Sequence, residues 1–170
     1  MEKCSHYDKI HNVKVPSISS PLLAYETGVH MSDGSLQIVD GGTHSTRYFG
    51  NSDDDFLFFC AILPYVIKQI YNKDVNIGMR TTGKTCNISV CSKKIALFKR
   101  DVLGLPVGNK INLQHIPKFI IENNKLAPFL CGFADGDMSL NFSKNYAGIP
   151  IYPEISCTLS NKGLLRDIVG

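Results

Sequence analysis

Two short segments of the chain repeat the same order of residue types, and each begins with an aspartate. Residues 33–38 read DGSLQI and residues 137–142 read DMSLNF. In each copy the acid, Asp33 or Asp137, precedes an alternation of apolar and polar residues that is typical of a strand with one buried face. Hard divalent cations such as Mg²⁺ prefer carboxylate oxygens as ligands. The internal repeat therefore predicts a pair of acids that could hold such cations.

Matching small residues precede each acid, in a segment where we expect a helix. Gly28 and Ser32 lie five residues and one residue before the first acid, and Gly132 and Gly136 lie at the same steps before the second. Small residues four apart share one face of a helix. They allow two backbones to approach more closely than the usual separation of about 8–10 Å. The sequence therefore predicts that the two helices cross and bring the acids together.

The strand that follows each acid predicts which residues fill the core. Leu36 and Ile38 alternate with polar residues in the first copy, and Leu140 and Phe142 do so in the second. We expect all of these apolar side chains to point into a core and their polar neighbours to point away from it.

The order of the remaining elements supports a repeated unit. In the first half we expect a helix ending at residue 33, strands 35–39 and 44–49, a helix from 51 to about 72, strands 75–80 and 86–91, and a helix over 94–103. The second half begins in the same way, with a helix over 125–137, strands 138–143 and 154–160, and a helix starting near residue 163. We therefore expect an α+β fold, a pseudo-symmetric αββαββα repeat with an antiparallel β-saddle. Its first half would span 1–104, a linker 105–124, and an incomplete second half 125–170.

Composition sets limits without indicating a function. The chain has 170 residues, 44% of them hydrophobic and 19% charged, which is typical of a globular protein. Its net charge of +3 is too small to argue for nucleic-acid binding from the total alone. The chain has no apolar run of the roughly 20 residues that a membrane helix needs, and its first residues lack the apolar stretch of a signal peptide. We expect an intracellular protein without a membrane partner, cytoplasmic in a prokaryote, with an organelle also open.

The segment around the second acid resembles a known signature. Residues 130–137, LCGFADGD, resemble the signature helix of the LAGLIDADG homing endonucleases over its whole length, with Met138 in place of the usual final glycine. Residues 26–34, ETGVHMSDG, are similar to it as a degenerate copy that keeps Gly28, Asp33 and Gly34. Together with the element order, the resemblance extends over most of residues 20–170.

The resemblance implies a site-specific endonuclease for double-stranded DNA, of mobile-intron or intein type. In that family a saddle of antiparallel strands lies over the major groove, and the two signature helices meet at the pseudo-symmetry axis. The last acid of each motif, here Asp33 or Asp137, would be a metal ligand, with Mg²⁺ or another divalent cation such as Mn²⁺ as cofactor. Two metals roughly 3.5–4 Å apart can stabilise both oxygens of an in-line displacement. The chain would act as a pseudo-symmetric monomer, or be completed by another chain or a missing segment.

Further site residues follow from the same scheme. Backbone carbonyls at the two helix ends make Ser32 and Gly136 candidate metal ligands. Lys110 and Lys144 are candidates for the basic groups that polarise the attacking water in this family. Outward-facing strand and turn positions are candidates for DNA contact, because Arg and Gln can read base edges and Lys can hold phosphate. These candidates are Gln37, His44, Thr46, Arg47, Arg80, Thr82, Lys84, Asn87, Ser89, Asn141 and Asn145.

Two other functions remain open at this stage. An intron RNA maturase could use the same saddle as a non-cleaving nucleic-acid binder. A sequence-specific transcription regulator could also do so, and it would not cleave under any metal condition.

Overall fold

An antiparallel sheet backed by helices forms the larger part of the molecule. The computed structural model describes residues 5–80, 83–109, 115–158 and 162–169. Its first part contains helix α1 (His6–Ile10), helix α2 (Pro21–Asp33), strands β1 (Gly34–Ile38) and β2 (His44–Asn51), the π-helical turn η1 (Phe58–Ile62), helix α3 (Leu63–Tyr71), strands β3 (Asn76–Arg80) and β4 (Thr85–Cys91), and helix α4 (Lys93–Asp101). From α2 to α4 this is the expected order of helices and strands.

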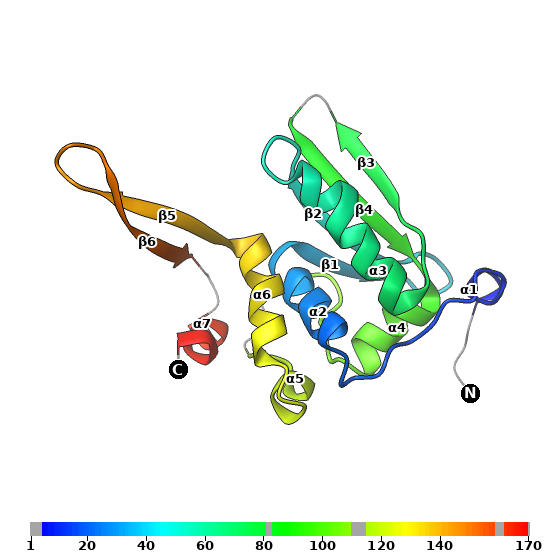
Figure 1. The fold of residues 1–170 in the computed structure, drawn as a ribbon. Coiled ribbons are helices and arrows are strands. Elements are labelled where there is room, and N and C mark those ends of the chain that lie inside the picture. The colour runs from blue at the N-terminus through cyan, green and yellow to red at the C-terminus, as the bar shows by residue number, and fades with distance from the viewer. Residues whose placement is uncertain (1–4, 81–82, 110–114, 159–161, 170) are drawn as a thin grey trace.

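The second part is smaller and extends to one side (Figure 1). It contains helix α5 (Lys118–Glu122), helix α6 (Leu126–Asp137), the hairpin of β5 (Met138–Lys144) and β6 (Pro150–Cys157), and helix α7 (Lys162–Val169). The mixed helix and strand class with an antiparallel sheet is confirmed. Helices α1 and α5 were not expected from the sequence.

The four-stranded sheet has the order β1-β2-β4-β3, and every neighbouring pair is antiparallel. Leu36, Tyr48 and Ile88 point from its inner face into the core and are almost fully buried. They pack with side chains of α2, α3 and α4 in one hydrophobic cluster, which also includes Phe129 and Phe133 of α6. The two parts of the chain therefore share a core.

Local sequence signals begin and end the helices. The Ser20 hydroxyl accepts a hydrogen bond from the Leu23 amide at the start of α2, where Pro21 takes a first-turn position. The Ser92 hydroxyl does the same for the Ile95 amide in α4. Helix α3 ends at Tyr71, and the next residue, Asn72, caps it with a left-handed φ of 52°.

The helix expected from residue 51 begins later than predicted. Asn51 still belongs to β2, and its amide donates to Asp55 Oδ2 at 2.8 Å, which closes a turn over 52–55. The π-helical turn η1 follows. Because Pro64 has no amide hydrogen to donate, the turn before α3 cannot keep a regular α-helical ladder.

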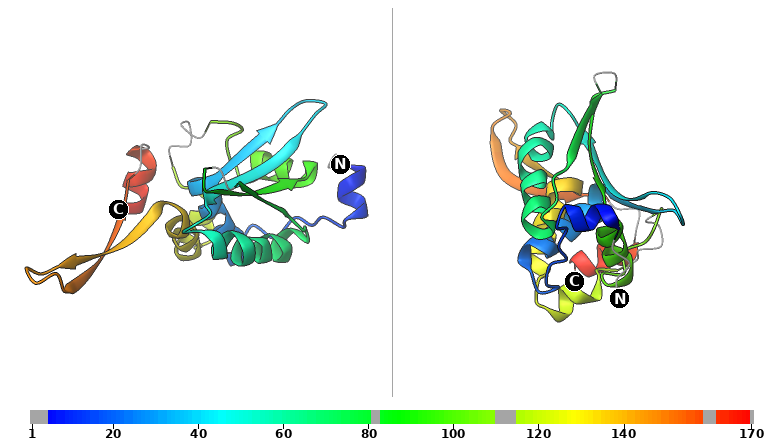
Figure 2. Two further views of the ribbon diagram at one scale, coloured as in Figure 1. Left: turned by 90° about the horizontal axis from the view of Figure 1, so that it is seen from above. Right: turned by 90° about the vertical axis from the view of Figure 1, so that its right-hand side faces the viewer.

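The apolar residues of the second hairpin are not buried as expected. Leu36 is 1% exposed in β1, whereas its counterpart Leu140 is 60% exposed in β5 and Phe142 is 52% exposed. Figure 2 shows the reason, because β5 and β6 project away from the body without a covering helix. Strand β6 also begins at Pro150 rather than at the expected residue 154, and prolines are tolerated in an edge strand.

The segment expected to be a simple linker is packed. Leu105, Ile116, Phe119 and Ile120 are buried in the common core. The Gly108 amide donates to the Leu36 carbonyl at 2.7 Å, so the start of this segment lies along the free edge of β1. In the described part of the chain, no helix combines the length and the apolar character that a bilayer crossing requires.

Candidate active site

Helices α2 and α6 cross with their backbones in contact at two glycines. A Cβ built at Gly132 would overlap the carbonyl oxygen of Tyr25, and its carbonyl carbon would be only 2.8 Å away. A Cβ built at Gly28 would overlap the Phe129 carbonyl oxygen and lie 2.6 Å from the Phe133 nitrogen. Real Cβ atoms do not approach backbone so closely, so each position requires glycine. The small residues that the repeat singled out are those at which the helices meet.

The two candidate acids lie at the same end of this crossing. A Cβ built at Gly136 would overlap the Ser32 hydroxyl and lie 2.7 Å from Asp33 Oδ2. The carboxylate of the first acid therefore lies against the backbone of the residue that precedes Asp137. Asp33 is half-buried, whereas Asp137 is exposed at the C-terminal end of α6.

Polar side chains next to the two candidate acids form hydrogen bonds of their own. The Tyr25 hydroxyl donates to Asp135 Oδ2, an interhelical bond that occupies the other acid of the second motif. The Ser32 hydroxyl donates to the Val29 carbonyl at 2.9 Å, within its own helix. Burial raises the pKa of the Cys157 thiol, and the negative charge of Asp137 raises it further, because Cys157 pairs with Met138, the residue after this acid.

The donor set fits a hard divalent cation of the magnesium type. Mg²⁺ is usually held by one or two carboxylates and keeps several waters. Asp33 and Asp137 supply two carboxylates at one end of the crossing, and the carbonyls of Ser32 and Gly136 end the same two helices. Within the described ranges, no group of three or more His, Cys, Asp or Glu side chains could hold a metal on its own. A closed zinc-type site is therefore not found among those residues.

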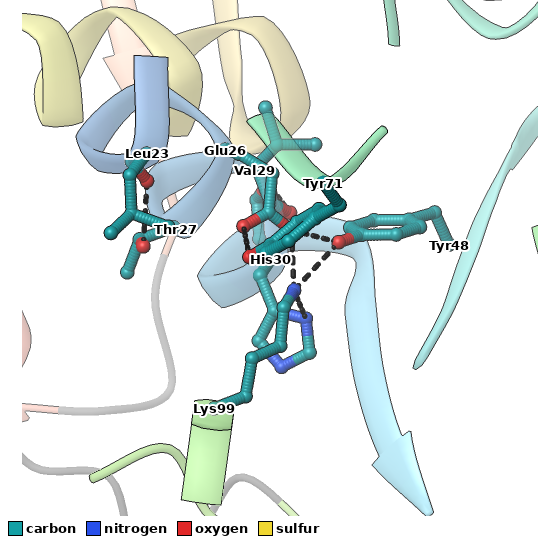
Figure 3. A network of polar contacts seen from close by, with 9 residues as sticks. Leu23, Glu26, Thr27, Val29, His30, Tyr48, Tyr71 and Lys99 are labelled. Atoms are coloured by element: carbon teal, nitrogen blue, oxygen red, sulfur yellow. Dashed lines mark hydrogen bonds and ion pairs between the residues drawn. The ribbon is translucent and has the colours of Figure 1, made fainter. Parts of the chain in front are cut away.

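A buried polar cluster anchors the inner face of α2 (Figure 3). Glu26 lies in α2 and accepts hydrogen bonds from the hydroxyls of Tyr48 and Tyr71. It also forms an ion pair with Lys99 of α4. Lys99 Nζ also donates to the Tyr48 hydroxyl at 2.8 Å and lies 3.4 Å from His30 Nδ1. All five side chains are almost completely buried.

Burial sets the protonation of this cluster. It lowers the pKa of Lys99, although the neighbouring Glu26 carboxylate opposes that shift. It raises the pKa of Tyr48 and of Tyr71, and the same carboxylate adds to both shifts. The two tyrosines therefore stay protonated and donate to Glu26. The cluster joins α2, β2, α3 and α4, and so fixes the helix that ends at Asp33.

This cluster was not predicted from the sequence. Its signal was Glu26, a charged residue inside an apolar helix, at the position where the signature begins with leucine. Such a residue is rarely buried without a partner of opposite charge. His30, one turn further along the same helix, is also buried, at 1% exposed.

The outer face of the sheet carries five of the eleven residues expected to contact DNA, namely Gln37, Arg47, Arg80, Asn87 and Ser89. Strand register places Arg47 beside Ser89, and Asn87 beside Phe49. Arg80 pairs with Thr85 at the next outward row. An open hollow on this face is lined by Arg47, Phe49, Arg80, Thr85, Asn87 and Ser89. Gln37 is exposed on the same face of β1.

Other candidates in the first part lie elsewhere. Thr46 is 1% exposed on the inner face, paired with Leu36, so the expectation that it contacts DNA is corrected by the direction of its side chain. His44 lies at the start of β2, and its Nδ1 is 3.0 Å from the Gly42 carbonyl. Lys84 lies in the β3–β4 turn and forms an exposed ion pair with Asp53. Thr82 and Lys110 lie outside the described residues.

The candidates of the second hairpin lie far from the helix crossing. Lys144 ends β5 and Asp137 directly precedes that strand, so at ~3.3 Å per residue they are roughly 20 Å apart. A lysine side chain cannot span that distance, and the assignment of Lys144 to the catalytic pocket is corrected. The Asn141 side chain donates a hydrogen bond to the Ser156 hydroxyl at 3.0 Å. The Asn145 side chain accepts hydrogen bonds from two backbone amides within the hairpin turn.

No protein-family model matches the chain, and no curated protein matches it. Its fold is similar to solved structures of the homing endonuclease I-DmoI. A variant of that protein bound to its target DNA, nicked in the coding strand and with Mn present, is 16% identical with a TM-score of 0.44. That alignment covers 72% of this chain and 63% of the other, so this chain matches less than two thirds of its length.

Two further structures of the same endonuclease give similar values. Mesophilic variants are 16% identical with a TM-score of 0.45, over 77% of this chain and 72% of theirs. Another variant, bound to its target DNA with Mn, is 18% identical with a TM-score of 0.44, over 77% and 71%. The similarity to these structures is one of fold.

Proposed function

We propose that this chain is a site-specific endonuclease that hydrolyses both strands of duplex DNA with a divalent cation. The observation that carries the proposal is the position of the Asp33 carboxylate, which lies against the backbone of the residue before Asp137 at the end of the glycine crossing. Two acids that belong to repeated segments and converge at one point suit a reaction that must be carried out on two strands. The proposed setting is homing of an intron or intein in the manner of the LAGLIDADG endonucleases.

The residues of the chain would divide the work between holding the cation and holding the DNA. Asp33 and Asp137 would hold Mg²⁺ or Mn²⁺ at the scissile phosphates, with the Ser32 and Gly136 carbonyls as further ligands. The bound cation would supply Lewis acidity for the addition of water across the phosphodiester bond. The buried Glu26 cluster would keep α2 in place during hydrolysis, when the charge on the scissile phosphates changes.

The outer face of the sheet would bind the duplex through its major groove. Arg47 and Arg80 are exposed there and can donate to guanine or to phosphate, and Asn87 can pair with adenine. Phe49 lies 45% exposed among them and could contact a thymine methyl. A monomer would suffice, because the two acids come from one chain.

Cleavage of a random library tests this proposal. The chain would be incubated with a plasmid library carrying randomised inserts, with Mg²⁺ or Mn²⁺, and the new double-strand ends would be sequenced. A recurrent sequence at the ends is expected. On that sequence, Asp33→Asn and Asp137→Asn should abolish double-strand cleavage and leave binding largely intact.

Asp135→Asn is the matched control, because it removes an acid of the same motif that pairs with Tyr25 instead of facing the first acid. It should keep cleavage. Full cleavage by either of the other two variants would contradict the assignment. Binding of intron RNA without cleavage of any DNA would favour the maturase function instead.

A further inference from the structure

A lysine buried at the edge of the sheet lines a pocket that the proposed active site does not use. Lys73 is 7% exposed, between α3 and β3. Its Nζ donates to the Tyr7 hydroxyl at 3.0 Å and lies 4.4 Å from the centre of that ring. The pocket, of about 160 Å³, is lined by Tyr7, His11, Lys73, Asp74, Asn76, Ser89 and Cys91.

The ammonium of Lys73 keeps capacity for another ligand. An ammonium group has three donors, and the Tyr7 hydroxyl takes one of them. Among the described residues, no carboxylate lies within ion-pair distance of Lys73. The acid in the pocket, Asp74, forms its ion pair with Lys68 at 2.9 Å, and it interacts with Lys73 and His11 through its charge at longer range. A buried cation with open donors is a site for an anion.

Helix α1 is held in place as one wall of this pocket. Asp8 is 1% exposed and accepts from the Ser92 hydroxyl at 2.6 Å and from the Lys94 amide at 3.1 Å, at the start of α4. Lys94 Nζ donates to the Val13 carbonyl at 2.9 Å, just beyond α1. These bonds hold α1 and the residues just after it, and the ring centroids of Tyr7 in α1 and of the next residue beyond the helix, His11, lie 4.2 Å apart. The wall is therefore built into the fold, although α1 is short.

The pocket adjoins the hollow on the outer face of the sheet. Ser89 lines both this pocket and the hollow that contains Arg47 and Arg80. Asn76 pairs with Ser89 in the register of β3 and β4, so both side chains belong to the outward row. A duplex that crosses the hollow would bring its backbone to the pocket at the flank of the sheet.

We propose that Lys73, with Tyr7 and His11, binds a backbone phosphate of duplex DNA at this flank. The inference rests on the proposed function, because the duplex lies on the face of the sheet that the endonuclease would use. The contact is to phosphate and not to a base edge. It therefore adds affinity without adding sequence preference.

The salt dependence of binding tests the site. Affinity for a random-sequence DNA duplex would be measured at several salt concentrations for the wild-type chain, Lys73→Met and Lys73→Arg. Loss of one phosphate contact lowers the slope of log affinity against log salt by about 0.9. Lys73→Met should show that loss and bind roughly tenfold more weakly at the lowest salt, since a hydrogen bond to a charged group is removed. Lys73→Arg should restore the slope.

Lys9→Met is the matched control, because Lys9 is an exposed cation on the same short helix and does not line the pocket. Its slope should equal that of the wild-type chain. Tyr7→Phe removes the hydroxyl that holds Lys73 and changes a side chain that is 49% exposed, so it probes the site without opening the core. It should reduce the slope in the same direction as Lys73→Met.

Hydrogen exchange gives a direct readout. Duplex DNA should protect the amides of residues 5–12 and 72–76 in the wild-type chain and not in Lys73→Met. DNA binding with equal slopes for Lys73→Met and wild type would overturn the site and leave the endonuclease proposal standing. Equal protection by inorganic phosphate alone would also overturn it, in favour of a free-anion site. Failure of the wild-type chain to bind any duplex would overturn the proposed function itself.

Discussion

The backbone of Tyr25 in α2 lies directly against the α-carbon of Gly132 in α6, so closely that a Cβ there would overlap the Tyr25 carbonyl oxygen. We expect Gly132→Ala to destabilise the protein by about 3 kcal/mol, because the obstacle is backbone and cannot rotate away. Urea denaturation measures the change. Gly42→Ala is the control, since a Cβ there would lie 3.2 Å from the Val39 side chain and no closer than 3.7 Å to backbone. Similar stability of the two variants would contradict the close crossing.

The buried Glu26–Lys99 pair predicts an asymmetric response to mutation. Lys99→Met should cost about 3–5 kcal/mol of unfolding free energy, because it leaves the Glu26 carboxylate buried without its cation. Lys68→Met removes the exposed partner of Asp74 and should lower the unfolding free energy far less, because solvent screens that pair. The two losses are compared by urea denaturation at neutral pH. Equal losses would show that the buried pair is solvated.

Asp8 predicts a stability difference that disappears in acid. Burial alone would raise its pKa, but hydrogen bonds from Ser92, Ser5 and the Lys94 amide outweigh it, so the pKa falls below 3.8. A depressed pKa means that Asp8 stabilises the fold at higher pH, and that this contribution is lost as the pH falls through the folded-state value. Asp8→Ala should therefore be about 2 kcal/mol less stable at neutral pH, since bonds to a charged group are lost.

The gap between Asp8→Ala and wild type should narrow steadily as the pH falls from 5 towards the folded-state pKa of Asp8. Denaturant midpoints across that range measure it. A constant gap would mean that the side chain acts without its charge. Because the same bonds hold α1, Asp8→Ala should also weaken DNA binding at the Lys73 pocket.

The unequal burial of the repeat predicts unequal losses at equivalent positions. Leu36→Ala should cost about 3 kcal/mol, because it opens a cavity in the core. Leu140→Ala should change stability by less than about 0.5 kcal/mol, since Leu140 is 60% exposed. Thermal and urea unfolding of the matched pair test this. A large loss for Leu140→Ala would show that the β5–β6 hairpin is covered in solution.

The crossing of the two helices could be predicted from the sequence more completely than the surface of the sheet. The role of Gly28 and Gly132 in the crossing could be predicted, because two backbones can approach closely only where a side chain is absent. The residue type glycine shows this directly. The direction of Thr46 could not be predicted, because a strand that begins with several short polar residues has no clear alternation. The exposure of Leu140 could not be predicted either, since the alternation in β5 is as regular as in β1.

The Glu26 cluster and the Lys73 pocket could not be predicted from the sequence pattern, for a different reason. Their members come from distant segments, and each contact depends on how the helices are placed on the sheet. Glu26 was visible as an anomaly, but its partner Lys99 was one of many lysines. Lys110, proposed from the family resemblance, lies outside the described residues and stays a prediction.

The crossing of α2 and α6 also has a consequence for how the molecule folds. It joins residues 21–33 to residues 126–137, across nearly the whole sheet unit. Contacts between such distant segments form slowly, because a long loop must close before they give any stabilisation. The sheet and its covering helices have their own local contacts and can form first. The two acids would then meet only in the last step, so the proposed cation site would be completed after the sheet that the proposal assigns to DNA.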